Sequence, residues 1–203
     1  MSSFWLLLLC ISLVSSIRIK QREQQLDSNQ TEENSVRCLA SSLAPIPGSY
    51  YMIQSKYGRY LDMGEGDAEI KVVQSISESY TKENEWGKEN YMIQLIENGD
   101  GYYWVKSKSG RYLDMRQWNP DETEVAWSIT AKRMKTNLWA KDSYLVKLID
   151  DGDSYFWIKS RHGRYLDMRQ EEGDIYEVLA VNETYVKKNQ EAKDSFVVRF
   201  VSV

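Results

Sequence analysis

The chain has 203 residues, with 26 Lys plus Arg against 30 Asp plus Glu, a net charge of −4. This balance offers no basic field to collect phosphates, so nucleic acid is not an expected partner. Hydrophobic residues make up 42% and charged residues 28%, which is typical of a globular chain, and the 14 Tyr and 7 Trp must either fill a core or bind something.

Residues 1–16 carry no charged side chain, run through an apolar stretch from Phe4 to Val14, and finish with Ser15 and Ser16. This pattern predicts a signal peptide cleaved near Ser16, and hence a secreted, extracellular protein. The alternative is a membrane anchor. An apolar run of about eleven residues is too short to span a bilayer, so no membrane span is expected.

Residues 17–48 are rich in Gln, Glu, Asn and Ser and are expected to form a flexible polar arm. Cys38 is the only cysteine outside the signal peptide. In an oxidising compartment an unpaired cysteine indicates either an intermolecular disulfide, giving a linked dimer, or a free thiol. Two sequons predict glycosylation, one at Asn29 in the arm and one at Asn182.

From residue 49 onward the sequence is built on a repeat. An aromatic phrase that ends in Arg-Tyr-Leu-Asp-Met occurs three times, and a second phrase beginning with Lys recurs in step with it. Two landmarks that keep one period predict three homologous repeats, at about 49–100, 101–153 and 154–203. The two phrases lie at 51–63, 103–115 and 156–168, and at 88–91, 141–144 and 193–196.

Alternating hydrophobicity predicts four strands in each repeat. The first and second strands flank a glycine turn that needs a positive φ, at Gly58, Gly110 and Gly163. The third strands are expected at 70–76, 124–130 and 176–182, and the fourth begin at Tyr91, Tyr144 and Phe196. The expected inward residues are Tyr51, Ile53, Ser55, Leu61 and Met63, with their equivalents Tyr103, Val105, Ser107, Leu113, Met115, Phe156, Ile158, Ser160, Leu166 and Met168.

The connections between repeats predict how the sheet closes. Asn98-Gly99 and Asp151-Gly152 are typical of tight hairpins, which makes the sheet antiparallel. The last strand ends the sequence with a free edge, and its available partner is the first strand of the first repeat. Twelve strands in three units are too few for a propeller, which takes about four blades or more.

The phrase from Ser160 to Leu166, preceded by Asp151-Gly152, resembles the repeats of fascin-like β-trefoils, and growth-factor-like trefoils carry a similar Arg-Tyr-Leu phrase. The resemblance covers roughly residues 49–203. It implies an all-β fold, a β-trefoil of three four-stranded repeats with pseudo-three-fold symmetry.

The sequence contains few of the residues that catalytic and metal-binding sites require. His162 is the only histidine, it lies in a predicted turn, and Cys38 lies in the arm, so no Ser-His-Asp or Cys-His device is expected. Clusters of His and Cys that would hold a metal are absent from the sequence. A non-enzymatic protein without cofactor or metal is therefore expected.

The second strands predict a binding surface. If Leu and Met point inward, each repeat shows a tyrosine and an aspartate outward, next to Met52, Trp104 or Trp157 of the first strand. A ring beside a carboxylate suits a sugar, since the ring stacks on C–H groups and the acid accepts from hydroxyls, as in lectin-type trefoils. The predicted carbohydrate-binding residues are Trp104, Tyr112, Asp114, Trp157, Tyr165 and Asp167, with Tyr60 and Asp62 as a weaker site.

The same residues have a structural interpretation. Asp62, Asp114 and Asp167 could pair with Arg59, Arg111 and Arg164 to brace each hairpin, while the rings close the ends of the barrel. Trp86 and Trp139 follow Asn84 and Asn137 and resemble the Gln-x-Trp phrase of ricin-type lectin repeats, although Asn replaces Gln and the typical disulfide is missing. Core packing is expected for both tryptophans.

Three functions fit the sequence. The first is a lectin-like protein that binds a glycan. The second is a secreted trefoil that binds an extracellular protein, as a ligand or inhibitor, through the unequal loops at 77–88 and 130–141. The third, actin bundling by analogy with fascin-like proteins, requires the cytosol and conflicts with the predicted signal peptide.

Overall fold

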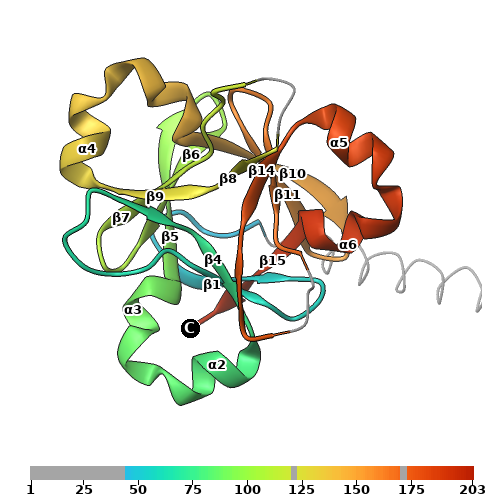
Figure 1. Cartoon of the computed structure of the whole chain (residues 1–203), viewed down its shortest axis with the longest axis horizontal. Coiled ribbons are helices and arrows are strands. Elements are labelled where there is room, and N and C mark those ends of the chain that lie inside the picture. The colour runs from blue at the N-terminus through green and yellow to red at the C-terminus, as the bar shows by residue number, and fades with distance from the viewer. Residues whose placement is uncertain (1–43, 120–122, 170–172) are drawn as a thin grey trace, which may run out of the picture. The chain divides into compact units, whose positions relative to one another are not determined.

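The computed structural model describes residues 44–119, 123–169 and 173–203, and strands connected into one sheet dominate them (Figure 1). The first repeat contains β1 (Tyr50–Ser55), β2 (Tyr60–Asp62), β3 (Ile70–Val72), β4 (Gln74–Ile76) and β5 (Met92–Gly99). The second contains β6 (Tyr102–Ser107), β7 (Arg111–Asp114), β8 (Glu124–Val125), β9 (Trp127–Thr130) and β10 (Leu145–Gly152). The third contains β11 (Tyr155–Ser160), β12 (Tyr165–Asp167), β13 (Ile175–Glu177), β14 (Leu179–Val181) and β15 (Val197–Ser202).

Six long strands form a closed antiparallel barrel. Around the ring, β1 pairs with β5, β5 with β6, β6 with β10, β10 with β11, β11 with β15, and β15 with β1. The closing pair has Tyr51 opposite Ser202 and Ser55 opposite Val198, which confirms the predicted partner of the last strand. The two predicted hairpins are also present, with positive φ at Gly99 and Gly152.

The predicted third strands are each divided in two. Val73, Ala126 and Val178 separate the halves and bond to one another in a ring: Val73 N–H donates to Ala126 O (2.9 Å), Ala126 N–H to Val178 O (2.7 Å), and Val178 N–H to Val73 O (2.9 Å). The expectation of one continuous strand was wrong. The first half pairs with a strand of another repeat, β3 with β9, β8 with β14 and β13 with β4.

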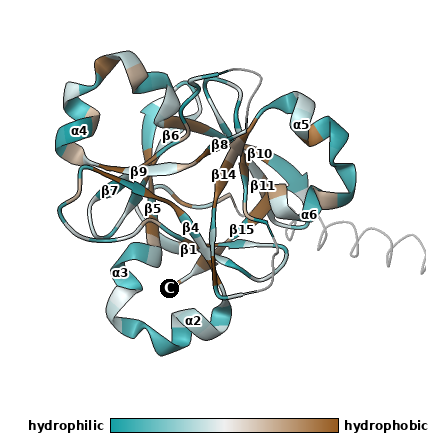
Figure 2. Cartoon of the chain, in the orientation of Figure 1, coloured by the Kyte–Doolittle hydropathy of each residue, from teal (hydrophilic) through white to brown (hydrophobic). Residues whose placement is uncertain are grey.

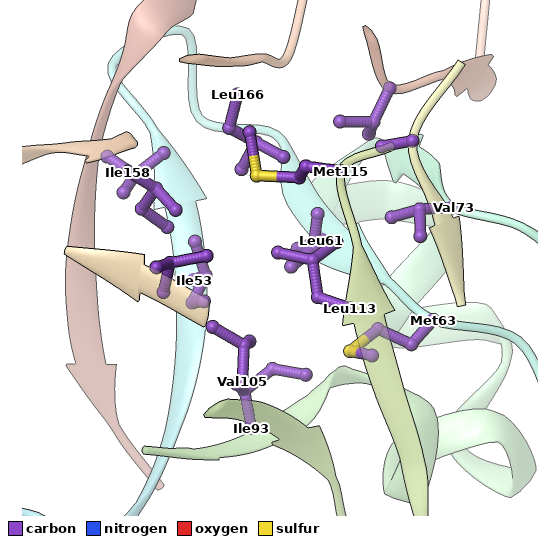
Figure 3. Packing of buried hydrophobic residues seen from close by; sticks show 14 of the residues in the cluster. Ile53, Leu61, Met63, Val73, Ile93, Val105, Leu113, Met115, Ile158 and Leu166 are labelled. Atoms are coloured by element: carbon purple, nitrogen blue, oxygen red, sulfur yellow. The ribbon is translucent and has the colours of Figure 1, made fainter. Parts of the chain in front are cut away.

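The core lies inside the barrel and beneath the paired short strands (Figure 3). Leu61, Leu113 and Leu166 are fully buried, as are the methionines two positions later, which confirms the predicted inward face of the second strands. Ile53, Val105 and Ile158 fill the barrel in the same way. Gly58, Gly110 and Gly163 adopt the positive φ that their turns were expected to need.

Each stretch between the third and fourth strands contains short helices, where loops were expected. They are α2 (Glu78–Glu83), η1 (Glu85–Gly87) and α3 (Lys88–Tyr91); α4 (Ala131–Thr136) and η2 (Leu138–Ser143); and α5 (Glu183–Lys188), η3 (Gln190–Ala192) and α6 (Lys193–Phe196). Ser77, Thr130 and Asn182 cap the first helix of each set by accepting a backbone N–H three residues on. The fourth strands therefore begin one residue later than predicted, at Met92, Leu145 and Val197.

The helical segments occupy three corners of the barrel domain in Figure 1. They are largely hydrophilic, whereas the hydrophobic stretches lie mainly on the strands (Figure 2). Two residues from the end of the predicted arm also contact this domain: Ile46 N–H donates to the Tyr51 hydroxyl (2.9 Å) and Gly48 N–H to Leu95 O (3.1 Å).

Three buried arginines connect neighbouring repeats. Arg111 of the second repeat donates to the carbonyl oxygens of Gly66 (3.1 Å) and Ala68 (2.9 Å) in the first repeat, and to Ser128 Oγ and O in its own. Arg59 does the same between the first and third repeats, through Gly173 O and Asp174 O. Arg164 donates to Asn119 O in the second repeat. Each guanidinium thus holds the adjacent repeat in place.

Candidate functional site

The three aspartates of the second strands are buried rather than outward. Asp62, Asp114 and Asp167 are at most 7% exposed, so the predicted surface of a ring beside a carboxylate is not present. Gly64 N–H donates to Asp62 (2.7 Å), the Ser143 hydroxyl donates to Asp114 (2.6 Å), and Arg169 pairs with Asp167 (2.9 Å).

The alternative pairing is not found either among the contacts of the described residues, where Arg59, Arg111 and Arg164 donate to backbone carbonyl oxygens. Asp114 instead forms a buried ion pair with Arg116, two residues along the chain. The helical segments explain the burial. Ser143 belongs to η2, and the backbone N–H of Met115 donates to Ser143 O (3.0 Å), so the segment covers the face that was expected to reach solvent.

Trp157, predicted to bind in the third repeat, is packed on several sides. Its ring stacks on Phe196 with centroids 5.9 Å apart and meets Tyr165 edge-on at 5.7 Å. Its indole N–H donates to Asp151 (2.8 Å), and Lys193, which pairs with the same carboxylate (2.9 Å), lies over the ring. Trp157 therefore works as a packing residue.

Trp104, the equivalent residue of the second repeat, lines a cavity of about 390 Å³. We call this cavity the Trp104 pocket. Its apolar lining is completed by Met134, Leu138, Tyr144 and Leu145, which come from α4, η2 and the start of β10. Volumes of about 300 to 1,000 Å³ are usual for small-molecule sites, so the pocket has room for a ligand of monosaccharide size or larger.

The polar lining of the Trp104 pocket is convergent and mostly cationic. It consists of Asn98, Lys135, Lys141, Asp142 and Arg161. Asp142 lies 3.8 Å from the Arg161 guanidinium, which belongs to the third repeat. Equivalent acid and base pairs join the other repeats, Glu89 to Lys108 (3.3 Å) and Asp194 to Lys56 (3.1 Å). The pair at Asp142 therefore spans a repeat boundary within the lining of the pocket.

Trp86 and Trp139 are 70% and 66% exposed, so the expected core packing was wrong. Trp139 contacts Trp118, itself 63% exposed, with ring centroids 5.4 Å apart. Leu138, 70% exposed, precedes Trp139 and also lines the Trp104 pocket. These residues form an exposed apolar patch, Trp118–Leu138–Trp139, on the second repeat.

Two predicted sites, Asn29 and Cys38, lie outside the described residues. Asn182 caps α5, since its Oδ1 accepts from Tyr185 N–H (2.7 Å). Within residues 44–119, 123–169 and 173–203, no group of His, Cys, Asp and Glu is arranged to hold a metal ion. None of the helices in these segments is long and apolar enough to cross a membrane.

Comparison by sequence gives no relative: no protein-family model and no curated protein matches the chain. Solved structures do match. A designed three-fold symmetric protein, ThreeFoil, is 24% identical with a TM-score of 0.56, and the match covers 76% of this chain and 99% of that one. The chain has a β-trefoil fold.

Larger proteins contain a similar trefoil. An exo-β-1,3-galactanase from Clostridium thermocellum matches with 22% identity and a TM-score of 0.57, over 80% of this chain and 32% of that one. A mosquitocidal holotoxin matches with 13% identity and a TM-score of 0.59, over 80% and 18%. The trefoil thus spans about a third of the galactanase and a fifth of the toxin.

The burial of Asp62 predicts a pH-dependent contribution to the stability of the trefoil. Burial raises the pKa of Asp62, and the hydrogen bond from Gly64 N–H opposes this only in part. A carboxyl with a raised folded-state pKa contributes stability that is fully present below its unfolded pKa of about 3.9 and is lost as pH rises through the folded pKa. Asp62→Asn should remove this contribution.

We therefore expect the free energy of unfolding of the parent, minus that of Asp62→Asn, to fall as pH rises from about 3 through the folded pKa and to be flat above it. Urea unfolding of both proteins between pH 3 and 7 measures this difference. A difference that grows with rising pH would mean that ionisation of Asp62 stabilises the trefoil.

Of the predicted binding residues, Trp104 lines the pocket, whereas the predicted aspartates are buried and are not part of its lining. Tyr60, Tyr112 and Tyr165 are half-buried beside them. The polar lining of the pocket was missed, although Lys141 and Asp142 belong to the second repeated phrase. In the sequence that phrase indicates only the length of the repeat, because the order of residues does not show that its Lys and Asp lie near Trp104.

Proposed function

We propose that this trefoil is a secreted, non-enzymatic carbohydrate-binding protein that binds a glycan in the Trp104 pocket. The observation that carries the proposal is that Trp104 lines a cavity together with the polar side chains of Asn98, Asp142 and Arg161. An indole offers a flat face for the C–H groups of a sugar, and the amide and charged groups donate to or accept from hydroxyls.

A comparison of the three repeats favours the second, where Trp104 packs in part against the cluster that includes Tyr144 and also lines the cavity. In the first, Met52 takes the position of Trp104, and a thioether has no flat face. In the third, Lys193 and Phe196 lie against the Trp157 ring. The sequence predicted glycan sites in both the second and the third repeats, and the proposal keeps only the site in the second.

One of the matched proteins, the galactanase, supports this proposal by its name. The galactanase acts on a polysaccharide, and the trefoil corresponds to about a third of that enzyme. Because the identity is 22%, the likeness concerns the fold, and the support for sugar binding comes from the pocket itself.

Trp104→Ala tests the proposal. Removal of the stacking face should weaken glycan binding by about tenfold or more, since about 1.4 kcal/mol corresponds to a factor of ten. The measurement is a glycan array followed by calorimetry on the best ligand. Trp86→Ala, which removes an exposed indole from the first repeat, is the matched control and should bind like the parent. Equal binding by Trp104→Ala and the parent would refute this site.

A protein partner is the second candidate, and the Trp118–Leu138–Trp139 patch favours it. Exposed aromatic side chains that pack on each other are enriched at the energetic centres of protein interfaces. If the protein is an extracellular ligand or inhibitor, a double change of Trp118 and Trp139 to Ala should abolish cell-surface binding while Trp104→Ala leaves it intact. The opposite pattern would favour the glycan.

A further inference from the structure

Lys135 and Lys141, which line the Trp104 pocket, occupy positions that are lysine in all three repeats. The equivalents of Lys135 are Lys82 and Lys187, at the fifth position of α2 and α5. The equivalents of Lys141 are Lys88 and Lys193, which follow the short helices η1 and η3. The three repeats therefore allow a direct comparison of how each lysine is neutralised.

In the third repeat both lysines have an acidic partner. Lys187 pairs with Glu183 (2.8 Å), one helical turn earlier, and Lys193 pairs with Asp151 (2.9 Å) in the preceding hairpin. In the first repeat Lys82 pairs with Glu78 (2.7 Å) in the same way, whereas Lys88 forms no ion pair with a carboxylate of the described residues, so only the second repeat leaves both lysines unpaired. The acid at the first position of the helix and the acid of the hairpin are thus the groups that neutralise these lysines.

The second repeat lacks both acids. Ala131 takes the position of Glu78 and Glu183, and Asn98 takes the position of Asp151. Within the described residues, neither Lys135 nor Lys141 forms an ion pair with a carboxylate. The carboxylate that the pocket does contain, Asp142, lies beside Arg161 (3.8 Å).

Three cations, one carboxylate and the indole side chain of Trp104 therefore line one cavity. A neutral sugar would leave both ammonium groups without a counter-charge. A carboxylate or sulfate on the sugar would accept charge-assisted hydrogen bonds from them, which are stronger than bonds between neutral groups. The pocket favours an anion even though the whole chain carries a net charge of −4.

We propose that the Trp104 pocket selects acidic glycans, in which a carboxylate or a sulfate ester on the sugar is bound by Lys135 and Lys141 while the ring stacks on Trp104. This inference rests on the proposed carbohydrate binding and narrows it to a ligand class. Asn98 and Ala131 set the selectivity indirectly, since the loss of an acid at each position leaves the lysines unpaired.

Pairs of glycans that differ only in charge test the inference. Maltohexaose and its sulfated form supply one pair, and hyaluronan hexasaccharide and its methyl-esterified form supply the other. An array that holds both pairs among neutral and acidic glycans, with calorimetry on the bound members, gives the affinities. Acidic members should bind about tenfold more tightly or better than their neutral counterparts. The responding pair distinguishes sulfate from carboxylate as the bound group.

Two double variants locate the effect. Lys135→Gln with Lys141→Gln should remove the preference for the acidic member, so that the two members of a pair bind this variant with affinities equal within about twofold. Lys82→Gln with Lys88→Gln removes the same two charges from the first repeat and should keep the preference. Raising the salt concentration from 0.05 to 0.5 M should weaken acidic binding by the parent, because salt screens such charges.

Asn98→Asp supplies a third, independent variant, because it restores the hairpin acid of the third repeat. It should weaken binding of the acidic glycan about tenfold, since the new carboxylate pairs with Lys141. The inference is overturned if bound glycans are neutral, or if the acidic preference survives in Lys135→Gln with Lys141→Gln. Binding of neutral glycans through Trp104 would leave the proposed function standing and remove only the inference, whereas binding of no glycan would remove both.

Discussion

Asp114→Ala should lower the free energy of unfolding by about 3 to 5 kcal/mol, because it leaves Arg116 as a buried charge without its partner. Asp114 has no exposed surface, and Arg116 is 6% exposed. The Ser143 hydroxyl would also lose the carboxylate to which it donates at 2.6 Å. Chemical denaturation monitored by tryptophan fluorescence measures the change.

The control for this experiment is Asp67→Ala, which removes an exposed aspartate from the loop between β2 and β3 and should change stability by less than about 0.5 kcal/mol. The comparison also separates the two interpretations of the second strands. If the carboxylate of Asp114 bound a sugar, its removal would lower the affinity for the glycan and leave the free energy of unfolding near that of the parent. A folded Asp114→Ala of normal stability would contradict the assignment of this residue as a structural group.

Arg111→Met should cost about 3 kcal/mol of stability, because the carbonyl oxygens of Gly66, Ala68 and Ser128 lose the donors that satisfy them. Methionine fills much of the same space, so the loss reflects hydrogen bonds more than a cavity. Burial also lowers the pKa of Arg111, and removing its charge offsets part of the cost. Urea unfolding gives the difference.

Lys132→Met makes the same kind of change on the exposed side of α4 and is the matched control. If Arg111→Met were as stable as that control, the hydrogen bonds of the guanidinium would do no more than offset the free-energy cost of burying its charge. The contact between the first and second repeats would then depend on packing alone. Hydrogen exchange of the amides around Gly66 would then be unchanged as well.

The barrel was predictable because its determinants are local and repeated. Alternation placed Ile53, Val105 and Ile158 inward, the glycines marked turns with positive φ, and the free edge of the last strand required the first as its partner. Each of these inferences needs only the chain direction and a period of two. The closed six-stranded ring follows from them.

The interruption of the third strands was not predictable from the same signal. Val73 directly follows Val72 and falls outside the alternation, but one such residue also fits a continuous strand; in the structure its backbone bonds to Ala126 of another repeat instead of a neighbouring strand. The short helices were missed for a related reason. Six residues are too few to show a helical period, although Ser77, Thr130 and Asn182 are good helix caps.

The missed helices account for the errors at the candidate site. Alternation assigns Asp114 to the face opposite Leu113, and that assignment is correct for the strand. The face was expected to reach water, but η2 covers it through Ser143. Trp104 was identified as a ring on a surface, whereas its polar neighbours come from α4, η2 and a turn of the third repeat, which only the folded chain brings together.

The ring of hydrogen bonds through Val73, Ala126 and Val178 joins each of the three repeats to both of the others. Each repeat supplies one backbone N–H and one backbone carbonyl to this ring. Two repeats alone would therefore leave one N–H and one carbonyl without a hydrogen bond in the interior of the trefoil. A solenoid can lose a terminal repeat and keep the rest, because its contacts are between neighbours. This closed arrangement has no terminal repeat, so we expect a destabilising change in one repeat to lower the stability of all three repeats together.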